Sequence, residues 1–255
     1  MAPRTLDRIP KTPLPTVQNA VEFHWSEIHS RADALRKLGP FRALDEPFVL
    51  ASKGTVLRMP LVIPAPPGIW DTPSWGEETV RERAARLARA ARSAAEEDDL
   101  ERYLDALPER LGVQWVVLLQ AGATALAVFE NGEPVATKSF KRYVVRGSGR
   151  AQPTHLNAKG KSRYGARLRL QNARRQLSET KERLARLRTE HGEPQQLFWG
   201  APKRLWADFA ALCAESSFGA AELIRIPLDL GVPTTAVLLD AYAQIARVRV
   251  ERPAS

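Results

Sequence analysis

The sequence predicts an α/β protein in which a mixed sheet with flanking helices follows a smaller α+β N-terminal region. Three observations support this fold class. From Gly112 onward, β-rich runs alternate with amphipathic helical patterns, as is typical of α/β layer architectures. Residues 113–120 (VQWVVLLQ) are almost continuously apolar, as expected of a central strand covered on both faces. The 255 residues, 44% of them hydrophobic, are enough to bury a core.

Composition divides the chain into three parts. Residues 1–16 are rich in proline, and we expect a flexible tail there. Residues 17–111 form an α+β region to which the sequence assigns no role. Residues 112–252 form the main domain, which contains a glycine-containing loop (146–162) and a long basic helix (163–191).

The N-terminal region carries both helical and strand patterns. Residues 17–38 repeat apolar side chains at helical spacing and predict an amphipathic helix. Residues 47–64 consist of two β-rich runs that meet at Lys53-Gly54, which predicts a hairpin. Two more helices are expected, at residues 74–95 and 100–111.

In the main domain the first strand is followed by strands at 125–130 and 135–145. Asn131-Gly132 between them is a strong hairpin signal, because both residues readily adopt the left-handed turn conformation. The elements predicted after the long helix are a strand at 195–199, a helix at 203–214, a strand at 223–228, a helix at 234–243 and a strand at 244–251.

The positive charge of the chain is concentrated in one segment, residues 138–188. The whole sequence has 38 basic and 29 acidic residues, and this segment holds 16 of the basic and two of the acidic ones. The remainder, with 22 basic and 27 acidic residues, is therefore mildly acidic. Such a local excess of positive charge is the electrostatic footprint of a nucleic-acid binder.

Within the basic segment, the 146–162 loop has no apolar side chain larger than Leu156 and cannot bury itself, so we expect it to be mobile in the free protein. The helix that follows carries one narrow apolar seam with arginines on its other faces, and Gly192 ends it. The seam consists of Ala166, Leu170, Ala173, Leu177, Thr180, Leu184 and Leu187.

Several function classes are excluded by what the sequence lacks. No Gly-x-Ser-x-Gly motif is present, and Cys213, the single cysteine, lies in a predicted amphipathic helix and is expected in the core. Residues 138–178 contain no acid, so this segment cannot hold the cations of a two-metal nuclease. We expect no metal and no cofactor. No apolar run approaches the roughly 20 residues that span a bilayer, and a cytoplasmic location is expected.

A cationic loop with a Gly-x-x-Gln core, Gly149 to Gln152, suits hydrolysis of the ester in peptidyl-tRNA. The backbone N–H and side-chain amide of Gln152 can orient water and stabilise a developing oxyanion. Glycine lets the loop approach a crowded RNA centre, while lysine and arginine neutralise phosphates. An amide is no strong general base, so RNA and substrate must contribute to proton transfer.

The motifs around this loop resemble those of the Vms-like release-factor family, relatives of the catalytic middle domain of eukaryotic and archaeal class I release factors. They comprise a basic strand end at 142–146, the Gly-x-x-Gln core, an Asn-Ala-Lys-Gly-Lys run at 157–161 and an Arg-rich helix at 165–175. The resemblance extends over roughly residues 112–252. It implies a release-factor middle-domain-like mixed sheet, peptidyl-tRNA hydrolysis on stalled large ribosomal subunits, Gln152 as catalytic residue and Gly149 as loop glycine.

The same resemblance implies that the protein binds the large ribosomal subunit, ribosomal RNA and peptidyl-tRNA, and we expect a monomer. The residues expected to contact RNA are Lys141, Arg142, Arg146, Arg150, Lys159, Lys161, Arg163, Arg167, Arg174 and Arg175. One departure from the family pattern is Pro153, which stiffens the chain after Gln152 and removes a donor. Two alternatives therefore stay open, a non-catalytic ribosome binder that acts in hibernation or stall sensing, and a plain RNA-binding protein.

Overall fold

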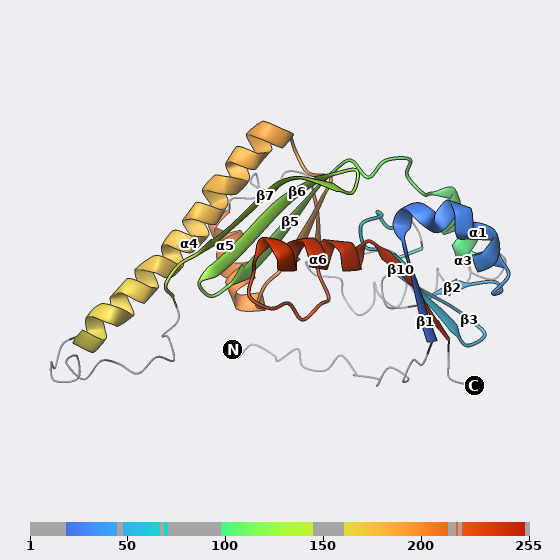
Figure 1. Cartoon of the computed structure of the whole chain (residues 1–255), viewed down its shortest axis with the longest axis horizontal. Helices are drawn as coiled ribbons and strands as arrows, with labels where there is room; N and C mark the ends of the chain where they lie inside the picture. The colour runs from blue at the N-terminus through green and yellow to red at the C-terminus, as the bar shows by residue number, and fades with distance from the viewer. Residues whose placement is uncertain are drawn as a thin grey trace, which may run out of the picture. The chain divides into compact units, whose positions relative to one another are not determined.

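The computed structural model describes residues 19–44, 48–66, 69–70, 98–144, 161–213, 218 and 221–252 (Figure 1). The chain forms two compact units. The first takes its described residues from 1–60, 65–107 and 247–255, and the second from 61–64 and 108–246. The expected assignment of 112–252 to one domain differs from this division, because the last strand belongs to the first unit.

The first unit contains a five-stranded sheet in the order β1-β10-β4-β3-β2, with antiparallel pairing throughout. The short helices α1 (Ile28–Arg36) and α3 (Asp99–Asp105) contact each other in this unit. The strands are β1 (Asn19–His24), β2 (Arg42–Ala43), β3 (Val49–Ser52), β4 (Thr55–Arg58) and β10 (Arg247–Arg252), and a 3-10 turn η1 (Trp25–Glu27) leads from β1 into α1.

The predicted helix at 17–38 is wrong at its beginning, because residues 19–24 form β1. This strand pairs with β10, placing Val21 opposite Val250 and Phe23 opposite Val248. Phe23 is buried while Val21 is 57% exposed. The pairing partner lies at the other end of the chain, so a local search for helical spacing could not reveal it, and tertiary pairing outweighed the local pattern.

The hairpin predicted at Lys53-Gly54 is confirmed. β3 and β4 pair antiparallel on either side of these two residues, which have φ of 34° and 86°. Both values lie in the left-handed region that tight hairpin turns require. The predicted helix at 100–111 is shorter than expected and is capped by Asp98, whose carboxylate accepts from the backbone N–H of Leu100 at 3.0 Å. The predicted helix at 74–95 lies entirely outside the described residues.

The second unit contains a mixed five-stranded sheet in the order β7-β6-β5-β8-β9. The first three strands are antiparallel neighbours, whereas β5, β8 and β9 run parallel. The strands are β5 (Val113–Gln120), β6 (Ala123–Glu130), β7 (Glu133–Lys141), β8 (Gln196–Gly200) and β9 (Glu222–Arg225). The predicted central strand is confirmed as β5, and the Asn131-Gly132 turn joins β6 to β7 with φ of 51° and 91°.

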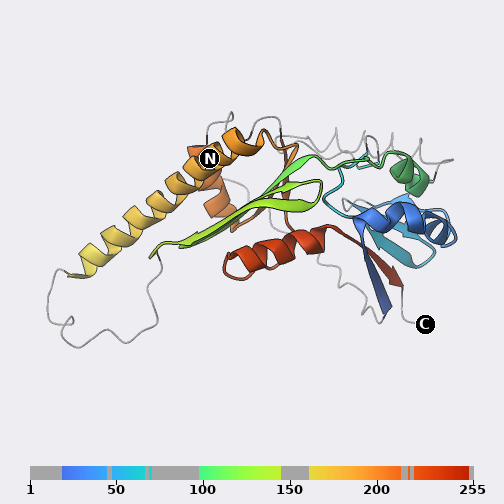
Figure 2. The same cartoon turned by 45° about the horizontal axis from the view of Figure 1, so that its top comes forward.

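Helices cover both faces of this sheet (Figure 1 and Figure 2). On one face, α4 (Lys161–His191) and α5 (Lys203–Leu212) contribute Leu184, Trp206 and Phe209 to a core that contains Trp115 and Val117 of β5. The opposite face is covered by α6 (Thr235–Ile245), where Tyr242 stacks on Phe129 with ring centroids 3.5 Å apart. The second unit is therefore a layered mixed-sheet fold, as predicted.

Candidate nucleic-acid interface

The segment predicted to carry the chemistry joins the end of β7 to the start of α4. The structure describes the chain as far as Val144 and again from Lys161. Five of the predicted site residues lie outside the described residues, namely Arg146, Gly149, Arg150, Gln152 and Lys159. What the structure provides is the geometry of the two ends between which this segment runs.

Gln176 joins α4 to the turn between β5 and β6. Its side chain is buried, and its Oε1 accepts a hydrogen bond from the backbone N–H of Gly122 at 2.9 Å. Its Nε2 donates to the carbonyl oxygens of Gln120 and Ala123, both at 2.9 Å, and lies 3.0 Å from the hydroxyl of Thr124. One amide therefore satisfies donors and acceptors along the whole turn.

Thr180 lies one helical turn beyond Gln176 and strengthens the same attachment. Its hydroxyl donates to the carbonyl oxygen of Gln176 at 2.8 Å and lies 3.4 Å from the hydroxyl of Thr124 on β6. Both threonines are fully buried. The sequence placed Thr180 in the apolar seam of the helix, and the structure shows that it packs there with its hydroxyl bonded.

The turn that Gln176 holds also contacts the end of β7. The backbone N–H of Arg142 donates to the carbonyl oxygen of Gly122 at 2.8 Å. Gly122 has φ of +85°, and a Cβ added there would lie 2.7 Å from the carbonyl oxygen of Arg142. Glycine is therefore required both by the backbone conformation and by the close approach of the neighbouring strand.

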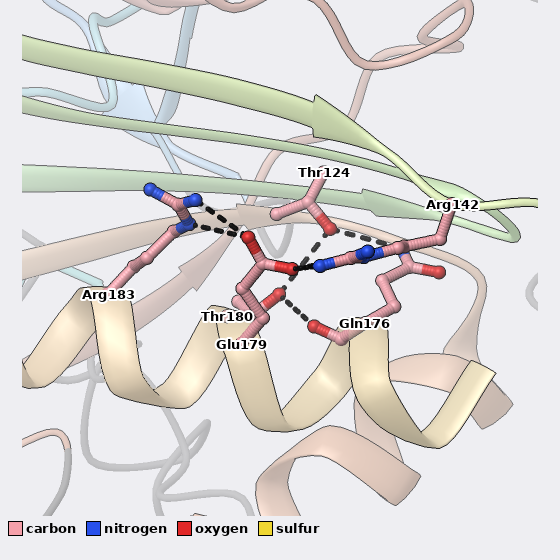
Figure 3. A network of polar contacts seen from close by, with 6 residues as sticks. All are labelled: Thr124, Arg142, Gln176, Glu179, Thr180 and Arg183. Atoms are coloured by element: carbon pink, nitrogen blue, oxygen red, sulfur yellow. Dashed lines mark hydrogen bonds and ion pairs between the residues drawn. The ribbon is translucent and has the colours of Figure 1, made fainter. Parts of the chain in front are cut away.

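Glu179 links the end of β7 to α4 by ion pairs (Figure 3). Its carboxylate accepts from Arg142, whose Nε lies at 3.1 Å, and from Arg183, whose Nη2 lies at 2.6 Å. The guanidinium of Arg183 also lies over the ring of Phe140, 4.9 Å from its centroid. Burial opposes ionisation of Glu179, but the hydrogen bonds from Arg183 and Arg142 outweigh it and lower its pKa.

A further bond holds the chain just past β7. The side-chain Nδ2 of Asn172 on α4 donates to the backbone carbonyl oxygen of Tyr143 at 2.8 Å. Together with Glu179 and the Gln176 turn, this bond attaches the chain to α4 immediately before the segment that contains Gln152. Three consecutive polar contacts from α4 thus fix one end of that segment.

The predicted packing seam of α4 is confirmed over its second half and wrong near its beginning. Leu184 is buried, and Leu177 and Leu187 are partly buried against the sheet. Leu170, in contrast, is 57% exposed. The first turns of α4 run past the end of the sheet, so no partner surface covers them there (Figure 1).

The predicted RNA-contacting residues that the structure describes lie around these attachments. Arg142 forms an ion pair with Glu179 but is still exposed. Lys141 is exposed at the end of β7. Lys161 and Arg163 lie in the first turns of α4, of which the structure describes the backbone. The remaining three are exposed on α4, away from the seam: Arg167, Arg174 and Arg175.

An open groove of about 430 Å³ lies between the end of β7 and the middle of α4. The sequence did not predict this groove, although Asn172, Gln176, Glu179 and Arg183 recur at helical spacing and form a polar stripe beside the leucine seam. That stripe is the signal from which the attachment could have been inferred. The charged residues of the groove are Arg142, Arg175, Glu179, Glu182, Arg183 and Arg186.

The part of the chain that the structure describes also contains histidine, cysteine and acidic side chains. Its histidine, cysteine, aspartate and glutamate side chains form no group of three that could hold a metal ion. Cys213 is buried in the core, as predicted, and burial raises the pKa of its thiol to about 11. None of the described helices is both long and apolar enough to span a membrane.

The solved structures that are similar to the chain include two distant likenesses. The chain is similar to the "Vms1 mitochondrial localization core", with 12% identity, a TM-score of 0.38, and coverage of 88% of this chain and 84% of that one. It is also similar to a "PilM-PilN type IV pilus biogenesis complex", with 14% identity, a TM-score of 0.30, and coverage of 89% and 74%. No curated protein matches the sequence.

Comparison with protein families is more specific. Residues 114–253 match the family described as "Bacteroidetes VLRF1 release factor". The match begins in β5, spans the segment with Gly149 and Gln152 as well as all of α4, and takes in more than half of the chain. The resemblance of the sequence motifs to Vms-like release factors is thereby confirmed, and the chain belongs to the Bacteroidetes VLRF1 release factor family.

Proposed function

We propose that this protein is a peptidyl-tRNA hydrolase that releases nascent chains from stalled or obstructed large ribosomal subunits. The observation that carries the proposal is the position of the Gly-x-x-Gln core, Gly149 to Gln152, inside the stretch that matches the release-factor family. The absence of acids from residues 138–178 adds support, because an RNA-filled centre favours a purely cationic segment.

In this proposal Gln152 positions the attacking water. Its side-chain amide and backbone N–H direct donors toward the ester carbonyl, where negative charge develops as the tetrahedral intermediate forms. Water attacks the carbonyl carbon, the ester bond to the tRNA ribose breaks, and a proton passes to the ribose oxygen. Since an amide is no strong base, groups of the RNA and the substrate handle that proton.

The attachments described above support this role by fixing the base from which the catalytic segment extends. Gln176, Glu179 and Asn172 tie the end of β7 and the β5–β6 turn to one helix. A catalytic group gains rate when rigid elements position it, since the reacting atoms then meet without further loss of entropy. Proposed partners are the large ribosomal subunit, ribosomal RNA and peptidyl-tRNA, bound by a monomer without a cofactor.

The proposal is tested by single-turnover release of nascent chains from isolated complexes of peptidyl-tRNA with large subunits. The Gln152→Ala protein should bind these complexes as the wild type does and release on the order of 100-fold more slowly, the usual loss for one oxyanion-type donor. Equal release rates at equal occupancy of the subunits would remove the hydrolase proposal.

The second candidate is a non-catalytic ribosome binder of release-factor ancestry, as in hibernation or stall sensing. Pro153 favours it, because proline directly after the glutamine removes a backbone donor and restricts the chain at the catalytic position. The release assay separates the candidates. A non-catalytic binder occupies the subunits but leaves the peptidyl-tRNA intact, with or without Gln152.

A further inference from the structure

The groove between the end of β7 and the middle of α4 has the charge of a polyanion site. Four of its lining residues are arginines and two are glutamates, so its net charge is positive. Two of the arginines, Arg142 and Arg183, are held in place by Glu179. The other two, Arg175 and Arg186, are exposed, and neither makes an ion pair with another of the described residues.

We propose that this groove docks the phosphate backbone of duplex RNA. Arg175 and Arg186 lie eleven positions apart on one helix, which separates their Cα atoms by roughly 16 Å along the helix axis. One phosphate cannot reach both, so the groove takes a run of consecutive phosphates. Arginine suits such contacts because its planar fork bonds two phosphate oxygens at once.

The composition of the groove favours a duplex over a single strand. Sites for unpaired bases combine cations with aromatic side chains on which the bases stack. The lining residues in the described part of the chain include no aromatic side chain. Duplex RNA offers phosphates and ribose hydroxyls at its surface and is recognised by shape, which needs only correctly spaced donors.

Glu179 gives the groove its fixed geometry. It holds the guanidinium groups of Arg142 and Arg183, which come from the end of β7 and from α4, on opposite sides of one carboxylate. Because Arg142 directly follows β7, RNA bound in the groove lies beside the stretch of chain that leads to the segment with Gln152. The groove therefore docks the protein close to its proposed catalytic segment.

Glu182 offers a way to test whether phosphate binds in the groove. It is exposed, lines the groove, and makes no ion pair with another described residue. A bound phosphate is therefore repelled by Glu182. Glu190, which is also exposed on α4 but lies outside the groove, 4.0 Å from the Nε2 of His191, serves as its control.

The experiment measures binding of the full chain to a 20-base-pair RNA duplex of arbitrary sequence, by fluorescence anisotropy between 50 and 300 mM KCl. The groove variant carries Arg175→Gln and Arg186→Gln. The control variant carries Lys203→Gln and Arg204→Gln, which remove the same charge from exposed positions on α5. Circular dichroism verifies that both variants are folded, and Arg186→Gln alone repeats the test with the smallest change.

The groove variant should bind about tenfold or more weakly at 100 mM salt, and the slope of log K against log salt should fall by about one unit per arginine removed. The control variant should keep affinity and slope within about twofold. Glu182→Gln should tighten binding, whereas Glu190→Gln should not. A single-stranded RNA of equal length should bind more weakly than the duplex.

Four results would overturn the inference. These are wild-type affinity and slope in the groove variant, an equal loss in the control variant, no tightening by Glu182→Gln, or equal binding of the single strand. The inference rests on the proposed function for its RNA partner, but its test does not involve hydrolysis. Failure of the Gln152→Ala release assay would leave duplex binding intact, and failure of duplex binding would leave release intact.

Discussion

The side-chain oxygen of Gln176 accepts a hydrogen bond from the backbone N–H of Gly122, and through it the long basic helix is attached to a turn of the central sheet. The nitrogen of the same amide donates hydrogen bonds to two carbonyl oxygens that flank that turn. A polar side chain that is buried costs free energy unless it is bonded, and here every polar atom of the amide is bonded.

Gln176→Leu should therefore lower the free energy of unfolding by about 2–3 kcal/mol, because the leucine fills the space but removes the acceptor of the Gly122 N–H and the bonds from the amide to two carbonyl oxygens. Gln171→Leu, at an exposed position on the same helix, is the control and should change stability by less than about 0.5 kcal/mol. Urea denaturation followed by circular dichroism measures both. Equal midpoints for the two variants would contradict the anchoring role.

Three glycine substitutions should form a graded series. Gly231→Ala meets no atom within 4 Å and has no positive φ, so it should be neutral or slightly stabilising. Gly192→Ala also meets no atom, but its φ of +82° should cost about 1–2 kcal/mol. Gly122→Ala combines φ of +85° with a Cβ 2.7 Å from a backbone oxygen and should cost about 3 kcal/mol or more.

Thermal unfolding of the three alanine variants tests the order. Because the atom that the new Cβ meets belongs to the backbone of Arg142, only Gly122→Ala should also disturb the end of β7. Hydrogen exchange should accordingly show faster exchange of the Arg142 amide, which bonds to Gly122, in that variant alone. Gly192→Ala as destabilising as Gly122→Ala would mean that backbone conformation, not close approach, decides the cost.

Stability should depend on pH through Glu179. The pKa of this carboxyl is lowered from its ordinary value of 4.5, since hydrogen bonds from Arg183 and Arg142 outweigh the opposing effect of burial. A lowered pKa in the folded state means that the stabilising contribution is complete above about pH 4.5 and is lost as pH falls through the folded pKa.

The measurement is the difference in unfolding free energy between wild type and Glu179→Gln from pH 7 to pH 2.5. Wild type should be more stable by about 1–2 kcal/mol above pH 5, and the difference should shrink as the pH falls below about 4. Glu190→Gln, on the exposed face of α4, should show little difference at any pH. If the difference in unfolding free energy between wild type and Glu179→Gln stayed constant across this pH range, the ion pairs of Glu179 would contribute nothing to stability.

The elements that the sequence predicted well are those specified by neighbouring residues. β5 is buried on both faces and reads as an apolar run, and the turns at Lys53-Gly54 and Asn131-Gly132 carry residues suited to positive φ. Gly192 ends α4 for the same reason, with φ of 82°. Local chemistry alone determines each of these features.

The features that could not be predicted from the sequence depend on contacts with residues far along the chain. β1 becomes a strand because β10 pairs with it. Gln176 bonds to backbone atoms 53 and 56 residues earlier, so the polar stripe on α4 indicates an attachment but not its partner, because a backbone carbonyl carries no sequence signal. Leu170 fits the helical seam perfectly in sequence but lies where the sheet no longer covers the helix, so periodicity predicted burial where no partner surface exists.

The last prediction concerns the charge of the proposed catalytic side chain. Gln152→Glu preserves the length and shape of the side chain but replaces an amide donor by a carboxylate. If the amide stabilises a developing oxyanion, the carboxylate repels it instead. Release by Gln152→Glu should therefore be no faster than by Gln152→Ala, at equal occupancy of large subunits.

The pH dependence of release distinguishes an oxyanion donor from a general base at position 152. A general base would be improved by a carboxylate, so release by Gln152→Glu would then exceed that of the wild type at neutral pH. An oxyanion donor requires the opposite order at every pH between 6 and 8, where the glutamate is ionised. Cys213→Ser is the control, because a buried thiol whose pKa is raised to about 11 supplies no thiolate there, and its release rate should stay within about twofold of wild type.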